Sequence, residues 1–351
     1  MRAVAGLPVQ TDRGLEHVRR VVADRPRATV VCIHGNCSSS YFFQSFLKSL
    51  PADLDGLAID LRGFGDSQTR PVDATRGMRD FADDVSAVLN ALAPTGPLVA
   101  VAHSAGAGVV LQLALDRPGL FAGLVLEAPL SPYGFGATRD AQGTPTTPDF
   151  AGSGAGAVNP AFVAAIESGD TSDGPVSPRT VLRTTYVAAG FAVPDEDALV
   201  DSILTTRTGD GNYPGDAATS QHWPHTAPGR SGMANAMSPR WFDVSAFADI
   251  EPQPVVTWVR GDVDVIVSDQ SALDFGTLGR MGVIPGWPGE EEFPSQPMVA
   301  QTRSVLDRFA SRGGQYQEIV LPGVGHSPHL EAPDAFLAAV LDTVPQRAVQ
   351  R

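Results

Sequence analysis

The chain has 351 residues, of which 43% are hydrophobic and 18% charged, so it is long and apolar enough to bury a full core and disorder is not expected. Its formal charge of -14 argues against a nucleic-acid partner, because phosphate binding needs clustered Lys and Arg. No apolar run of about 18 residues and no apolar leader are present, so we expect neither a membrane span nor export, and hence a cytoplasmic protein.

Short runs rich in β-branched residues predict buried strands. In chain order they cover residues 29–33, 56–60, 98–102, 124–127, 255–259 and 317–321. Helical patterns at 78–92 and 108–116 lie between several of them, and this alternation predicts an α/β fold with a mostly parallel sheet and crossover helices. Residues 14–22 mix apolar and polar positions, which favours an antiparallel strand at the sheet edge before the parallel set.

The alternation of strands and helices stops between residues 131 and 250, where Gly, Pro, Ser and Thr clusters mix with helical pieces such as 160–167 and 179–189. No strand of the main sheet is evident there. We therefore predict one core in two parts, residues 1–130 and 251–351, with 131–250 as a largely helical lid insertion.

A serine lies where the run 98–102 ends and a small-residue helix begins. The stretch around it is VAVAHSAGAG, with the nucleophile candidate Ser104 between Ala102 and Gly106. It resembles a nucleophile elbow, whose tight strand-to-helix turn needs small residues two places before and two places after the serine. Alanine replaces the usual glycine at Ala102. A plain helix N-cap is the alternative.

Three further stretches follow predicted strands. His34-Gly35-Asn36-Cys37 closes the run 29–33, DLRGFGDS spans residues 60–67, and RGDVDVIV spans 260–267. A fourth, LPGVGHSPH at 321–329, contains His326 before the pattern of a last helix.

Together these stretches resemble the α/β-hydrolase fold superfamily, over roughly residues 25–130 and 250–345. The resemblance implies a catalytic triad in the order nucleophile, acid, histidine, with Ser104 as nucleophile, Asp264 as acid and His326 as general base. Asp262 and Glu127 remain alternative acids, and His329 is the competing histidine.

The same resemblance implies an oxyanion hole formed by the backbone N–H groups of Asn36 and Ala105, the second at a helix N-terminus. The DLRGFGDS stretch and the His34 side chain are expected to be structural. No cofactor and no metal are expected.

We expect the substrate to contact His103 and three lid aromatics, Trp223, Trp241 and Phe242, with packing of the lid onto the core as the alternative for each. The expected ligand is a small-molecule hydrophobic ester or lactone.

The HGN loop is similar to that of haloalkane dehalogenases, but those enzymes use an aspartate where this chain has Ser104. A serine favours acyl chemistry on a carboxylic ester or lactone. A C–C bond hydrolase, an acyltransferase or an aminopeptidase with the same triad, and a ligand-binding protein without catalysis, remain open alternatives. The oligomeric state cannot be predicted from these patterns.

Overall fold

The computed structural model describes residues 2–345 and contains one eight-stranded sheet in the order β1-β2-β4-β3-β5-β6-β9-β10. Its strands are β1 (Ala5–Gln10), β2 (Leu15–Val21), β3 (Ala28–Ile33), β4 (Leu54–Ile59), β5 (Leu98–His103), β6 (Gly123–Glu127), β9 (Val255–Gly261) and β10 (Gln315–Leu321). From β4 to β10 all neighbouring strands pair in parallel. The predicted α/β fold with a mostly parallel sheet is therefore confirmed.

The antiparallel end of the sheet differs from the prediction. β2 pairs with β1 on one side and β4 on the other, so β2 is an inner strand and β1 forms the edge. The strand β1 was missed because only Val9 is buried in it, which leaves no period-two pattern to recognise. Pro8 fits this position, since an edge strand tolerates a missing N–H.

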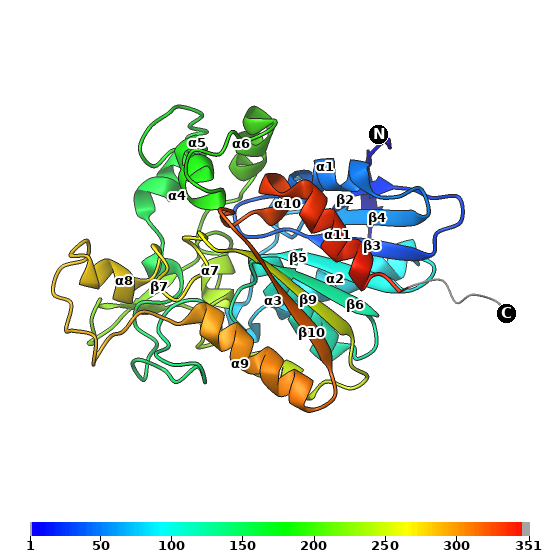
Figure 1. Ribbon diagram of the computed structural model, residues 1–351. Coiled ribbons are helices and arrows are strands. Elements are labelled where there is room, and N and C mark those ends of the chain that lie inside the picture. Colours follow the sequence, from blue (N-terminus) through cyan, green and yellow to red (C-terminus); the bar gives the residue numbers. More distant parts are fainter. Residues whose placement is uncertain (1, 346–351) are drawn as a thin grey trace.

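Helices cover both faces of the sheet (Figure 1). One face packs against α2 (Arg79–Leu92), α3 (Ala105–Asp116), α9 (Met298–Ser311) and the 3-10 helix η5 (Ser245–Asp249). The other packs against α1 (Gln44–Ser49), α10 (Pro328–Glu331) and α11 (Pro333–Thr343). The inner strands β3, β4 and β6 are buried along their whole length because both of their faces are covered.

Between β6 and β9 the chain leaves the sheet. Besides η5, its helical elements there are η3 (Ala155–Ala157), α4 (Pro160–Glu167), α5 (Pro178–Val181), the π-helical turn η4 (Leu182–Tyr186), α6 (Glu196–Leu204) and α7 (Met233–Ala236). The strands β7 (Ala217–Thr219) and β8 (Thr226–Pro228) pair only with each other. Figure 1 shows α4, α5 and α6 as one group beyond the end of the sheet nearest α10.

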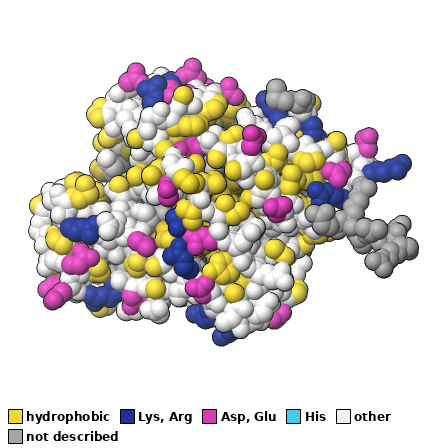
Figure 2. All heavy atoms as spheres, viewed as in Figure 1, with side chains coloured by type: hydrophobic (Ala, Val, Ile, Leu, Met, Phe, Trp, Pro, Cys, Tyr) yellow, Lys and Arg dark blue, Asp and Glu magenta, His cyan; other side chains and the backbone are white. Residues whose placement is uncertain are grey.

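A second excursion, between β9 and α9, contains α8 (Phe275–Arg280). Its Phe275 and the following Phe293 pack edge-to-face against Trp223 of the first excursion. Charged side chains of both signs are scattered over the face drawn in Figure 2, and hydrophobic side chains gather where the α4–α6 group meets the core. Across residues 2–345, none of the helices has the length and apolar character needed to cross a membrane.

Candidate active site

Ser104 lies in the turn that joins β5 to α3, with φ 54° and ψ -121°. A non-glycine residue rarely adopts a positive φ, and such strain persists only when the surrounding structure enforces it. Here the Ser104 N–H donates to the carbonyl of Glu127 and its own carbonyl accepts from Leu130 N–H. The serine is therefore held in the strained conformation of an elbow, which leaves it only partly buried.

The small residues around Ser104 are needed because α3 begins directly beside β3. A Cβ atom added to Gly106 would lie 2.4 Å from the Ile33 carbonyl oxygen and 2.6 Å from that of His34. Ala102 is fully buried on β5, opposite Ile33 of β3. The glycine is thus required two places after the serine, and an alanine suffices two places before it.

The loop after β3 lies against this elbow. A Cβ on Gly35 would lie 3.0 Å from the Ser104 Cβ, so Asn36, the next residue, is beside the nucleophile candidate. His34 holds the loop: its Nε2 accepts the Leu61 N–H at 3.0 Å, so Nδ1 carries the proton and donates to the Gly35 carbonyl at 2.8 Å. Burial lowers the pKa of His34, which keeps it neutral for this role.

His326 follows β10 and is held by Asp264, which follows β9. The His326 Nδ1–H donates to Asp264 Oδ2 at 2.8 Å, and both side chains are buried. The other carboxylate oxygen, Oδ1, accepts the backbone N–H groups of Ile266 and Val267 at 2.8 and 3.0 Å. Because these bonds orient the carboxylate and fix the imidazole tautomer, Nε2 is left as the basic nitrogen.

Ser104 and His326 lie on the same edge of the sheet because they follow the parallel strands β5 and β10, and His103 links the two segments. The Nε2–H of His103 donates to the His326 carbonyl at 2.9 Å, and the two rings are 4.8 Å apart. Within residues 2–345 no hydrogen bond joins Ser104 Oγ to His326 Nε2. Such bonds often form only when substrate is bound.

The alternative acids have other partners. Asp262 accepts the Gly323 N–H at 2.6 Å, and Glu127 accepts from His329 at 2.7 Å. Among the carboxylates considered in the sequence, the structure pairs Asp264 with His326.

The four residues predicted to contact the substrate have different surroundings in the structure. Phe242 is fully buried, with its ring beside Gly108 of α3, and Trp241 donates its indole N–H to the Gly229 carbonyl. Trp223 donates to the Pro285 carbonyl in the second excursion. The structure thus shows packing contacts for all three aromatics, whereas His103 lies next to the serine with its ring against His326.

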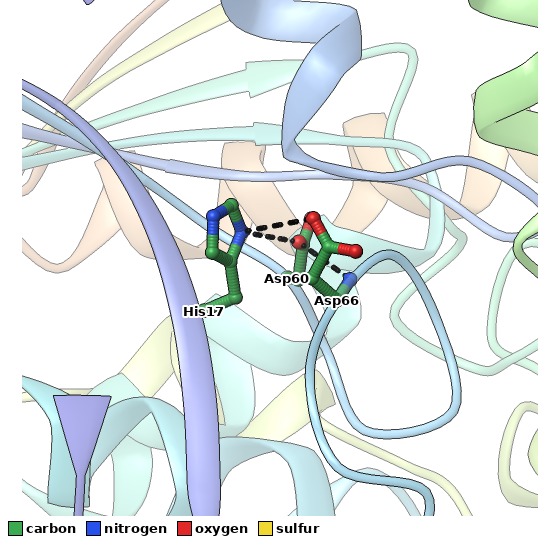
Figure 3. A group of neighbouring side chains, drawn as sticks. All are labelled: His17, Asp60 and Asp66. Carbon is green, nitrogen blue, oxygen red and sulfur yellow. Dashed lines mark hydrogen bonds and ion pairs between the residues drawn. The ribbon is translucent and has the colours of Figure 1, made fainter. Parts of the chain in front are cut away.

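A histidine and two aspartates, His17, Asp60 and Asp66, lie close enough to hold a metal ion (Figure 3). The Asp60 oxygens, however, already accept from His17 Nδ1, the Asp66 N–H and the Ser40 N–H, at 2.8, 3.1 and 2.6 Å. Burial would raise the pKa of Asp60, but the hydrogen bond from His17 and its other donors outweigh it and lower the pKa. Asp60 thus anchors its own loop as a carboxylate, a structural role.

Two residues near the site were not singled out from the sequence. Glu331 accepts the Gly325 and Ser327 N–H groups on either side of His326, and its place five residues after that histidine, in the stretch GHSPHLEAP, could have identified it. Tyr186, in η4, donates to the carbonyl of Asn36, and its ring stands perpendicular to that of His326. No sequence pattern marks Tyr186, because its partner is 150 residues away.

A family model described as the alpha/beta hydrolase family matches residues 30–339. An uncharacterised hydrolase, YugF of Bacillus subtilis, is 36% identical over 101 residues, which are 28% of this chain and 36% of YugF. A probable lysophospholipase of Arabidopsis thaliana, BODYGUARD 1, is 31% identical over 133 residues, which are 36% of this chain and 28% of that protein. The chain thus covers about a third of the length of these relatives.

Among solved structures, the carboxylesterase CesB (YbfK) of Bacillus subtilis is 14% identical. Its alignment has a TM-score of 0.58 and covers 97% of this chain and 91% of CesB. At this identity the likeness shows a shared fold over nearly the whole chain.

Proposed function

The chain belongs to the alpha/beta hydrolase family, and we propose that it is a serine hydrolase that cleaves a carboxylic ester or lactone through an acyl-enzyme. The observation that carries the proposal is the His326–Asp264 pair at 2.8 Å, on the same sheet edge as the strained Ser104. A base oriented by a carboxylate, on the same sheet edge as a partly buried serine, is the arrangement that nucleophilic acyl transfer requires.

The proposed reaction begins with proton transfer from Ser104 Oγ to His326 Nε2 while the oxygen attacks the ester carbonyl carbon. The tetrahedral oxyanion accepts hydrogen bonds from the N–H groups of Asn36 and Ala105, neither of which donates to another group within residues 2–345. His326 then gives its proton to the leaving alcohol, which leaves the acyl-enzyme. A water molecule, deprotonated by the same Nε2, releases the acid and restores Ser104.

Asp264 supports both proton transfers without giving up its own charge. Its carboxylate accepts the Nδ1–H of His326 and attracts the imidazolium that forms when Nε2 is protonated. The two backbone N–H donors to its other oxygen keep it aligned.

The proposal assigns the lid to residues 131–250 and the core to 1–130 and 251–351. It is supported by the departure of the chain from the main sheet between β6 and β9 and by the contacts of η4 and α6 with the loops at the site. A lid so placed controls access of the acyl group and of water.

The test is to incubate the purified protein with a fluorophosphonate probe and with p-nitrophenyl esters of increasing acyl length, beside Ser104→Ala and His326→Ala. We expect wild type to be labelled and to hydrolyse short esters, with no labelling of Ser104→Ala and little turnover by either variant. Wild type that is neither labelled nor active on any ester would show that the proposed function is wrong.

A further inference from the structure

Residues 186–188 cross from the lid to the two loops that hold the candidate oxyanion donor and the general base. At one end of this segment the Tyr186 hydroxyl donates to the carbonyls of Asn36 and Cys37, at 2.9 and 3.1 Å. At the other end the Ala188 N–H donates to Glu331 Oε2 at 2.8 Å. The segment therefore binds both loops at once.

Ala188 packs tightly against the loop that holds His326. A Cβ on Gly325 would lie 2.4 Å from Ala188 N, so the segment packs directly on the residue before His326. Glu331 accepts the Gly325 N–H at 3.0 Å as well as the Ala188 N–H, and its carboxylate therefore joins the loop to the segment.

The Tyr186 hydroxyl contacts the loop after β3 at a residue with a strained backbone. Cys37 has φ 46°, a conformation that a non-glycine residue keeps only where the surrounding structure imposes it. The Tyr186 hydroxyl binds two successive carbonyls here, that of Asn36 and that of Cys37 itself. These two contacts restrain the peptide that joins Asn36 to Cys37.

Tyr186 is itself well placed to stay rigid and protonated. Its ring packs against Phe42 at 5.9 Å and stands perpendicular to the His326 ring at 6.3 Å. Burial raises the pKa of the Tyr186 hydroxyl well above its usual value, so it remains a donor throughout the working range of an enzyme. The π-helical turn that ends at Tyr186 is a geometry often found at functional sites.

Within the proposed function, on which this inference rests, we infer that Tyr186 is a positioning residue. Its hydroxyl holds the Asn36–Cys37 backbone so that the Asn36 N–H points at the forming oxyanion. Because the tie comes from the lid, the oxyanion hole is complete only when residues 186–188 are seated on both loops. Ser202 of α6 adds a second tie, since its hydroxyl is 2.6 Å from that of Ser39 in the same loop.

The test compares Tyr186→Phe with wild type and with a matched control, Tyr316→Phe, whose lost hydroxyl binds Asp307 in the α9–β10 region. The measurements are kcat and KM on a p-nitrophenyl ester, the rate of fluorophosphonate labelling, and amide hydrogen exchange in the peptide that covers residues 34–40. For Tyr186→Phe we expect kcat and labelling to fall together by about 10- to 100-fold, less than the full loss of an oxyanion donor. KM is expected to stay within about twofold because the binding of ground-state substrate does not use this donor. Exchange should rise in residues 34–40 only.

The measurements distinguish a failure of the inference on Tyr186 from a failure of the proposed function. Esterase activity in wild type with unchanged kcat in Tyr186→Phe overturns the inference and leaves the proposed function standing. A fall in kcat without faster exchange in residues 34–40 also overturns the inference, since the loop would not have been released. A wild type that hydrolyses no ester overturns the proposed function and this inference with it.

Discussion

Glu127 and His329 form a second carboxylate–imidazole pair beside the His326–Asp264 pair. Glu127 Oε1 accepts both the backbone N–H and the Nδ1–H of His329, each at 2.7 Å, and both side chains are almost completely buried. The His103 ring is 4.8 Å from His326 and 5.4 Å from His329. Burial, reinforced by these two histidines, lowers the pKa of His103 well below its usual value and keeps it neutral.

The two pairs lead to opposite expectations for their carboxylates. Asp264→Asn should lower kcat by about 10³- to 10⁴-fold, because an amide no longer holds the imidazole tautomer. Glu127→Gln should instead lower the free energy of unfolding by about 1–3 kcal/mol and change kcat by less than about tenfold, because it weakens a buried bond to His329. Steady-state kinetics and denaturant unfolding of both variants check this. A larger loss of kcat in Glu127→Gln than in Asp264→Asn would make Glu127 the acid of the triad and Asp264 the structural carboxylate.

Helix α3 offers a matched pair of glycines for testing the elbow. Gly106→Ala should destabilise the protein by about 1–3 kcal/mol and reduce activity, because its Cβ would meet the backbone oxygens of Ile33 and His34. Gly108→Ala should cost less, since its Cβ would meet side-chain atoms of Leu130 and Phe242 that can move. Thermal unfolding and esterase assays of both variants measure the difference, and equal effects would contradict it.

We expect the stability of the protein to depend on pH through the ionisation of Asp274. This buried carboxyl caps α8, and burial raises its pKa from 3.8 to about 6. Because the folded protein binds this proton more tightly than the unfolded chain, the contribution of Asp274 to stability falls as pH rises from about 4 to 6 and stays low above that. Asp274→Asn should therefore stabilise the protein above pH 6, by an amount on the order of 2–3 kcal/mol, and much less near pH 4.

The Asp274→Asn effect is measured by urea unfolding between pH 4 and 8. The asparagine can keep the acceptor role, because both backbone N–H groups, of Thr277 and Gln296, bind the same carboxylate oxygen. Asp210→Asn, which removes a carboxylate at an exposed loop position, is the control. A pH-independent effect at Asp274 would contradict the prediction.

Arg62 tests the structural role expected of the DLRGFGDS stretch. Its buried guanidinium binds Asp84 through two hydrogen bonds of 2.5 and 2.8 Å. Arg62→Met should lower the free energy of unfolding by about 3–5 kcal/mol, because buried carboxylates lose a partner, while activity per folded molecule is kept. Arg79→Met, which breaks an exposed pair with Asp116, should cost less than about 1 kcal/mol. A loss of kcat in folded Arg62→Met would instead assign the stretch to catalysis.

The local sequence carries most of the information on the core. The predicted strands appear in order with small shifts of their ends, and the helix expected over residues 160–167 forms as Pro160–Glu167. Buried strands are recognisable because parallel sheets cover both faces with apolar residues, and the family pattern around Ser104 and His326 depends on residues adjacent in the chain.

Tertiary structure alone decided the relations between distant segments. The edge position of β1, the burial of Phe242 against α3 and the partner of Glu127 follow from packing and have no local pattern. The same holds for Tyr186, whose hydroxyl reaches a loop 150 residues earlier in the chain. The sequence by itself determined which residues could form strands, a nucleophile elbow and a base. The fold decided which carboxylate meets which histidine, because the close packing of the strands and helices that carry them sets the distances between these side chains.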